Sequence, residues 1–372
     1  MSLEPDDVPT LFGTRNVIDD ETSSFRTTIE RVGLGLTALL ALIMLSFILV
    51  DWARLLPGVV GDTADIYFQL LLLAGSHLDT LLGIEVFAFP FMLRAIATGI
   101  LVGVVGPMVG AFLVHRQMAL IGETLAHTAF AGVAFGMLVV AFAGGIVGGV
   151  IGDEATLLVV ALVVSVVGAL GLQWLTARTD NYGDVPISIV LTGSFALGTV
   201  VISLSRGFVA LTVDIEDFLF GSLAIVTVEG ARIVALLSVV VTVLVISHYK
   251  QLLSVTFDEQ AARAAQCDVR FYNALLVVMT AVVVVGAMQI LGVILVAGLL
   301  VIPVAAASQI AISFRETVIL SVLFGQVSVL SGLFIAVAAG LPPGGSIILI
   351  AIAFYLLAVV RSDHSTSVVR MH

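Results

Sequence analysis

The feature of this chain that most constrains its fold is the recurrence of long segments without a charged residue. Residues 271–314 and 317–360 contain no Asp, Glu, Lys or Arg. One helix that crosses a bilayer needs about 20 apolar residues, so each segment has room for two. Charged residues make up only 11% of the chain, whereas soluble domains carry roughly 25%. We therefore predict an all-α, polytopic helical membrane protein.

Charges and turn residues divide the chain into about ten predicted spans. Gly292 divides the first long segment, and the Pro-Gly residues within 341–345 divide the second. Residues 66–84 are amphipathic and are expected to lie along the membrane surface. The remaining predicted spans are 32–50, 91–114, 123–142, 155–177, 184–204 and 229–248.

The distribution of arginine and lysine predicts the orientation. Ten spans place both termini on one side, and that side carries most of the 15 basic residues, which makes it cytoplasmic. The polar stretch 249–270 falls on the same side. We expect an acidic cytoplasmic tail (1–31) whose first 25 residues are disordered, an extra N-terminal span with an interfacial segment (32–89), a core domain (90–361) and a second cytoplasmic tail (362–372).

Composition and missing motifs exclude several functions. The formal net charge of -11 leaves no basic surface for nucleic acid. Lys250 is the single lysine, which fits a high-salt organism or a genome that favours arginine codons. Cys267 is alone, so no internal disulfide or cysteine-based zinc cluster forms. The chain has neither a Gly-x-x-x-x-Gly-Lys phosphate loop nor the His-Glu-x-x-His motif of zinc proteases.

Glu123 and His127 are the candidate ligands of a metal ion. A spacing of four places them on one helix face, one turn apart. A carboxylate and an imidazole both suit divalent transition metals. Alternatively, Glu123 complements the helix dipole and His127 is a hydrogen-bonded interior residue. Two ligands are too few for a closed site, so this pair favours passing an ion over holding it.

Small and polar residues inside the spans predict helix packing. Glycines four residues apart let neighbouring helices approach closely. Such pairs are Gly99 and Gly103, Gly106 and Gly110, and Gly132 and Gly136. Gln289, Gln309 and Gln326 are expected to form hydrogen bonds between helices.

The polar stretch 249–270 contains a second candidate. Asp258 and Glu259 open an alanine-rich run, which predicts a short helix. The helix could be part of an ordinary loop or a docking element for a cytoplasmic partner.

The residues around Glu123 resemble a known family. The run 110–136 contains His115-Arg116-Gln-Met118 followed by Gly122-Glu123-Thr-Leu-Ala-His127. It is similar to the membrane permease of the zinc/manganese/iron-type metal ABC importers. Segments 217–229, 252–258 and 285–307 resemble further motifs of that family in the same order. Where the family more often has Asp, this chain has Glu123, which keeps the charge and adds one methylene.

The resemblance implies a type II ABC importer permease fold in the plasma membrane. It implies that two permease copies form the pathway and that an extracytoplasmic metal-binding lipoprotein delivers the ion. It implies that the transported metal contacts Glu123 and His127, and that this metal is zinc, manganese or iron. It also implies that the chain has no permanently bound cofactor. Separate cytoplasmic ABC ATPases would hydrolyse ATP, so the chain itself is not an enzyme. The implied ATPase-coupling residues are Asp258, Glu259, Ala261, Ala262 and Ala265.

Two other functions remain open from the sequence. A secondary transporter or channel would need no ATPase, although such carriers usually have several intramembrane ionisable groups. A membrane enzyme would need a nucleophile and base that the sequence does not reveal. Thr124-Leu-Ala-His127 and Gly132-Val-Ala-Phe-Gly136 resemble the zinc-type members of the family, but a single carboxylate and a single imidazole do not name the metal.

Overall fold

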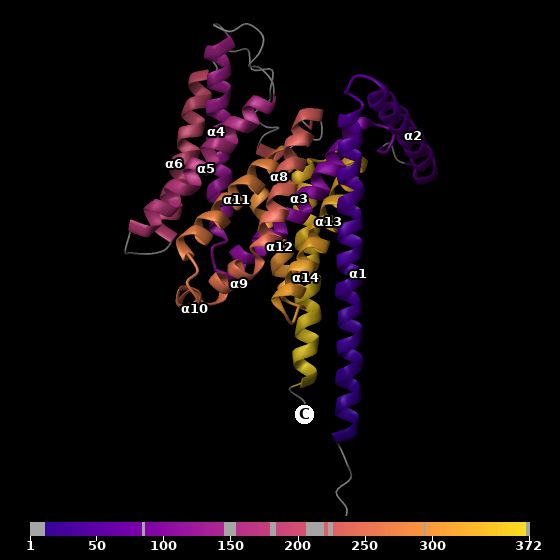
Figure 1. Ribbon diagram of the computed structural model, residues 1–372, viewed down its shortest axis with the longest axis vertical. Helices are drawn as coiled ribbons and strands as arrows, with labels where there is room; N and C mark the ends of the chain where they lie inside the picture. The colour runs from indigo at the N-terminus through magenta and orange to yellow at the C-terminus, as the bar shows by residue number, and fades with distance from the viewer. Residues whose placement is uncertain are drawn as a thin grey trace, which may run out of the picture.

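The fold is that of a computed structural model, which describes residues 12–83, 86–144, 154–178, 184–205, 219–221, 226–293 and 295–369. All regular elements of this described part are helices (Figure 1). They are α1 (Phe12–Ala53), α2 (Val59–Leu82), α3 (Pro90–His115), α4 (Leu120–Gly144), α5 (Glu154–Arg178), α6 (Asp184–Ser205), α8 (Val228–Ser247), α9 (Tyr249–Phe257), α10 (Glu259–Ala264), α11 (Val269–Leu291), α12 (Val296–Ser308), α13 (Phe314–Ala339) and α14 (Pro343–Val369).

Nine helices of the described part are long and apolar enough to cross a membrane. They match nine of the predicted spans. The tenth, α12, has 13 residues and a rise of about 20 Å, which is shorter than a hydrocarbon core of about 30 Å. No charge marks its ends in the sequence, so its shortness was not foreseen. The predicted divisions are confirmed, because α11 ends at Leu291, directly before Gly292, and the segment 341–345 contains the start of α14 at Pro343.

The α3 helix forms the centre of the bundle. It packs against α1, α8, α11, α12 and α13, and nearly all of its span is buried. Its glycines allow this closeness: a Cβ on Gly103 would lie 3.2 Å from the backbone of Gly325 on α13. A Cβ on Gly110 would overlap the carbonyl oxygen of Leu300 on α12. The predicted glycine packing is confirmed at both positions.

Polar contacts attach α1 to this core. The carboxylate of Asp51, which is buried, accepts from Arg94 Nε of α3 at 2.7 Å and pairs with Arg54 Nε at 2.9 Å. Deeper in the bundle, Gln326 Nε2 of α13 donates to the carbonyl oxygen of Thr37 at 3.2 Å. That bond confirms the prediction for Gln326.

The same prediction of hydrogen bonds between helices is not confirmed for the two other glutamines. Gln309 is exposed after the last turn of α12, and the described part of the chain gives its side chain no bond between helices. The side chain of Gln289 lies outside the described residues.

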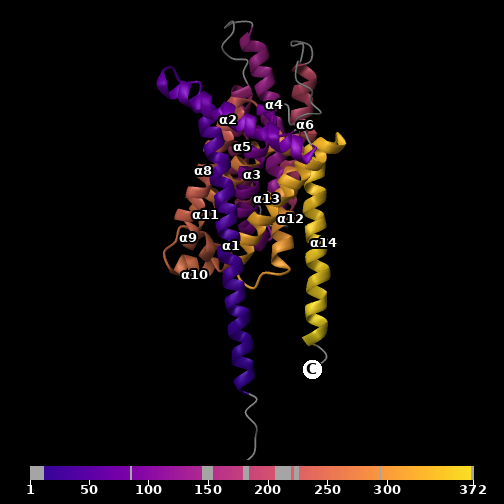
Figure 2. The same ribbon diagram turned by 90° about the vertical axis from the view of Figure 1, so that its right-hand side faces the viewer.

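The polar elements gather at one end of the molecule. Figures 1 and 2 show that the first turns of α1 and the last turns of α14 extend from the end where α9 and α10 lie. This arrangement agrees with the prediction that both termini share a side with residues 249–270.

One expectation for the N-terminal tail is wrong. The first 25 residues were predicted to be disordered, yet α1 begins at Phe12. Extending an existing helix gains a hydrogen bond for each residue that is fixed, so the apolar span can continue into this polar segment. Residues 206–218 and 222–225, between the predicted spans 184–204 and 229–248, lie outside the described part.

Candidate functional site

The first two turns of α4 carry the two predicted metal ligands. A tight turn after α3 precedes it, in which Gln117 has a φ of 58° and Met118 N donates to Leu113 O at 2.9 Å. Because this turn is short, α4 begins at Leu120. Glu123 therefore lies near the start of the helix and His127 one turn deeper, as predicted. Because the carboxylate and the imidazole lie on one helix face, both can reach the same ion.

His127 is half-buried and lacks a partner for one nitrogen. Its ring lies edge-on to Phe195 of α6, with ring centroids 5.1 Å apart, and Phe195 also stacks on Phe130. Its Nδ1 is buried, and no hydrogen-bond partner for it exists among the described residues. The predicted alternative, a hydrogen-bonded interior histidine, has no support at this nitrogen. An imidazole nitrogen in this state is available to a ligand from outside the chain.

Glu123 is exposed on the surface of the single chain. The neighbouring hydroxyls are already engaged, since Thr124 donates to Leu120 O at 3.0 Å and Thr128 to Leu125 O at 2.8 Å. Within the described residues, no three His, Cys, Asp or Glu side chains converge on one point. A single chain thus offers two ligands here and leaves one of them facing outward.

The predicted short helix in the polar stretch is present as α10. Asp258 caps it, because its Oδ1 accepts from the backbone N–H groups of Gln260 and Ala261, both at 2.9 Å. Asp258, Ala261 and Ala265 are exposed, as a docking surface requires. Ala262 is fully buried, so it holds α10 to the protein and does not face a partner.

An ion pair connects α10 to the turn before α4. Arg116, whose side chain is only 9% exposed, donates from Nη2 to Glu259 Oε1 at 2.9 Å. Glu259 also pairs with Arg263 at 3.4 Å on its own helix. Burial lowers the pKa of Arg116, and the charge of Glu259 offsets part of that shift. The candidate coupling helix and the candidate metal helix are therefore linked through one side chain.

Aromatic rings reinforce this link. His115 lies edge-on to Phe314 with centroids 4.9 Å apart, and Phe257 packs against the same ring at 5.5 Å. Phe257, the last residue of α9, is nevertheless 61% exposed. Neither Phe257 nor Arg116 was predicted as a functional residue. A large aromatic side chain within a polar stretch was the available sign for Phe257, and the place of Arg116 in the run that resembles the family was the sign for Arg116.

Comparison with known proteins gives these features a context. Residues 88–362 match the model of the ABC 3 transport family. The manganese transport system membrane protein MntC of Listeria monocytogenes is 27% identical over 270 residues, which are 73% of this chain and 90% of that protein. The high-affinity zinc uptake system membrane protein ZnuB of Haemophilus influenzae is 23% identical over 275 residues, 74% of this chain and 99% of that protein.

A solved structure agrees with the sequence relatives. A chain of PsaBC from Streptococcus pneumoniae, in complex with Fab, superposes with a TM-score of 0.62 and 31% identity. The match covers 73% of this chain and 91% of that one. The expected ABC importer permease fold is confirmed. Since the family match spans most of the sequence and includes Glu123, His127 and α10, this chain belongs to the ABC 3 transport family.

Proposed function

We propose that this permease moves a divalent transition metal, Mn²⁺ or Zn²⁺, past Glu123 and His127. The observation that carries the proposal is the buried, unpartnered Nδ1 of His127, one turn from an exposed carboxylate. A site that must release its ion gains from having few ligands. A carboxylate suits manganese and an imidazole suits zinc, so this pair is compatible with either metal.

Family membership decides between the transport classes. An ABC permease is a multi-pass protein of the plasma membrane, and a separate subunit hydrolyses the ATP. The chain is thus a permease that works with an ATPase and a substrate-binding protein, and it is not itself an enzyme. An ATP-independent carrier or channel is not the function of this family.

A second copy of the chain completes the proposed pathway. Glu123 faces outward from one chain, and two ligands leave most of a metal's coordination positions open. A second copy would contribute another Glu123 and His127. The binding protein, which we expect to be a lipoprotein, would deliver the ion from outside.

The ATPase is proposed to dock on the exposed face of α10. Asp258, Ala261 and Ala265 lie on that face, and Phe257 adds exposed apolar surface beside them. Glu259 would pass movement of the docked subunit to Arg116 and so to the turn before α4. This assignment requires α10 to be cytoplasmic, as the arginine distribution predicts.

Uptake of labelled Mn²⁺ and Zn²⁺ into proteoliposomes containing the permease, its ATPase and its binding protein tests the metal assignment. Glu123→Ala and His127→Ala should each reduce uptake at least ten-fold, since even outer-shell changes cost about 10- to 100-fold at metal sites. Complex assembly and basal ATP hydrolysis should survive. Asp62→Ala and His77→Ala are matched controls outside the family match. Wild-type uptake by both α4 variants would contradict the assignment.

A further inference from the structure

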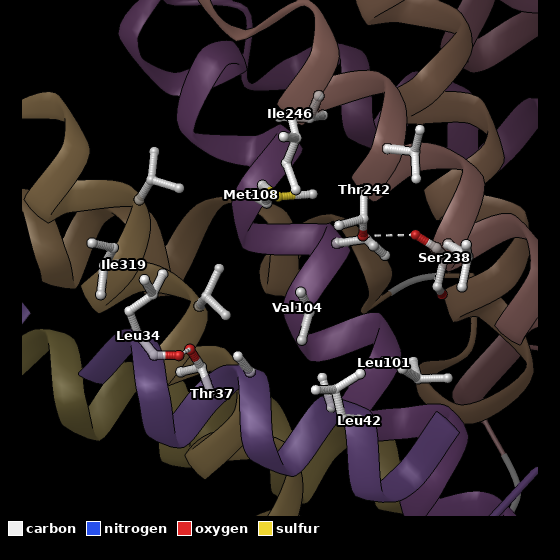
Figure 3. A pocket seen from close by; sticks show the side chains of 18 of the residues that line it. Leu34, Thr37, Leu42, Leu101, Val104, Met108, Ser238, Thr242, Ile246 and Ile319 are labelled. Carbon is white, nitrogen blue, oxygen red and sulfur yellow. Dashed lines mark hydrogen bonds between the residues drawn. The ribbon is translucent and has the colours of Figure 1, made fainter. Parts of the chain in front are cut away.

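A cavity of about 730 Å³ lies on the side of α3 remote from the candidate metal residues. Its walls come from the spanning helices α1, α3, α8 and α13, and Tyr249 of α9 lines one end. Figure 3 shows side chains of these helices around it, including Leu42, Val104, Met108, Thr242 and Ile319. In Figure 1, α1 and the α4–α6 group lie on opposite sides of the central helices. The cavity is therefore separate from the proposed metal pathway.

The lining of the cavity is apolar. Thr37 and Thr242 are among the few polar residues, and their hydroxyls donate to their own helices, to Leu34 O at 3.1 Å and Ser238 O at 2.7 Å (Figure 3). Water would find few partners on these walls. All four wall helices are candidate membrane spans, so lipid hydrocarbon is the apolar material available to fill the space.

The length of the cavity matches one leaflet of a bilayer. Along α1 its lining extends from Leu34 to Leu45, a rise of about 16 Å at 1.5 Å per residue. Half of a hydrocarbon core of about 30 Å is about 15 Å. An acyl chain that enters from the interface would thus extend along the whole cavity to the middle of the membrane.

A positive charge lies at the end of the cavity nearest α9 and α10. Arg315, in the first turn of α13, lines this end together with Tyr249 of α9. Arg315 is exposed, and the described part of the chain gives its side chain neither an ion pair nor a hydrogen bond. The adjacent carboxylate of Glu316 is turned toward the backbone, where Oε2 accepts from Ile312 N at 2.8 Å.

Two further groups at this end of the cavity could interact with an anion, the phenol of Tyr249 and the guanidinium of Arg31. Burial raises the pKa of Tyr249 more than the nearby Arg315 lowers it, so its phenol keeps its proton and can donate. Arg31 of α1 lies two residues before Gly33, where a Cβ would be 3.5 Å from Ile319 of α13. Ile319 follows Arg315 by one turn, which places Arg31 at a similar depth.

We infer that the cavity binds an anionic phospholipid of the leaflet on the α9–α10 side, with an acyl chain between α1 and α3. Its phosphate would pair with Arg315 and accept from the hydroxyl of Tyr249. Basic residues at the interface beside apolar clefts between spans are suited to such head groups. The lipid would fill the space between the extra N-terminal helix and the core, beside the bond from Gln326 Nε2 to Thr37 O that attaches α1 at this level.

Native mass spectrometry of the detergent-purified complex tests this site, with phosphatidylglycerol as the probe and phosphatidylcholine as the uncharged-head comparison. We expect wild type to retain phosphatidylglycerol in preference. Arg315→Ala should weaken retention about five-fold, the effect of one basic residue at a membrane surface, and Arg315→Lys should restore it. Arg270→Ala is the matched control, since Arg270 is also exposed and is also the second residue of a spanning helix.

A second variant tests the cavity itself. Ala41→Trp fills the space from α1 and should abolish retention of phosphatidylglycerol, whereas Ala353→Trp on the exposed face of α14 should not. Helix content by circular dichroism and association with the ATPase establish that each variant is folded. The inference would be overturned if wild type retained both lipids equally or if Ala41→Trp bound phosphatidylglycerol undiminished. It would also be overturned if Ala41→Cys cross-linked to a second copy of the chain across the cavity.

Discussion

A buried imidazole nitrogen without a partner destabilises a folded chain unless a ligand binds it. His127 Nδ1 is in this state, whereas His115 Nδ1 is 2.8 Å from Ala111 O. An unsatisfied buried polar group costs about 1–3 kcal/mol. The two histidines are therefore expected to affect stability in opposite directions, although both lie near the connection of α3 to α4: His115 ends α3, and His127 is in the second turn of α4.

Replacing each histidine by leucine makes this difference measurable. His127→Leu should leave the thermal unfolding midpoint unchanged or raise it, because the orphaned nitrogen is removed, and should abolish any rise caused by Mn²⁺ or Zn²⁺. His115→Leu should lower the midpoint, because it loses a hydrogen bond and its contact with Phe314. Differential scanning fluorimetry with and without metal provides the readout. A destabilised His127→Leu that still responds to metal would show that His127 is structural.

Asp79 is a second residue whose side chain is expected to affect the stability of the fold. Its carboxylate accepts from the backbone N–H groups of Val86, Phe87 and Ala88 at 2.8–3.1 Å, which fixes the connection from α2 to α3. Burial raises the pKa of Asp79, but these three bonds outweigh it and lower the pKa below its ordinary value. A carboxyl with a lowered folded pKa stabilises the fold above pH 4, and that stabilisation is lost as the pH falls through the folded pKa.

Asp79→Ala should therefore reduce the free energy of unfolding by about 1–3 kcal/mol at neutral pH. The difference from wild type should shrink as the pH is lowered below 4. Unfolding midpoints in detergent between pH 3 and pH 7 measure it, with the exposed Asp62→Ala on the same helix as control. A difference that does not depend on pH would mean that packing, not the charge, explains the effect.

Among the elements, the six-residue helix α10 has residues proposed to dock the ATPase next to a residue that packs against the permease core. Ala261 is exposed and Ala262 is fully buried beside Val255 and Val269. Ala261→Trp should prevent association with the ATPase and leave the unfolding midpoint unchanged. Ala262→Trp should lower the midpoint, since overpacking a filled site costs about 1–3 kcal/mol. Pull-down of the ATPase and thermal unfolding distinguish the two; an Ala261→Trp permease that still couples transport to ATP would exclude α10 as the docking element.

The elements also show what the sequence could and could not predict. Gly292, Gly340 and Asp258 mark helix boundaries by local conformation and capping, so those boundaries were predictable. The pairing of Arg116 with Glu259 joins residues 143 positions apart, and the contact of Phe195 with His127 depends on how α6 packs on α4. Such contacts follow from tertiary structure and leave no periodic pattern in one sequence. The placement of Glu123 and His127 one turn apart on α4 was predictable from their spacing, but the side chains around them were not.

For the whole molecule, the arrangement of the helices predicts accessibility from each side of the membrane. Cys267 is the single cysteine, so Cys267→Ser provides a background for labelling. A cysteine replacing Ala264 on α10 should react with a membrane-impermeant maleimide only from the cytoplasmic side. One replacing Thr63 on α2, which follows the first span, should react only from outside. Labelling of both positions from the same side would contradict the proposed orientation.

The bond between Arg116 and Glu259 also has a thermodynamic consequence. It ties a surface available to a protein subunit to the turn that begins the helix of Glu123. Coupling between two binding sites is reciprocal: if a bound subunit at α10 changes the affinity for an ion at Glu123 by some factor, the ion changes the affinity for the subunit by the same factor. The affinity of the ATPase for the permease should then depend on metal concentration, and Glu259→Gln should weaken that dependence.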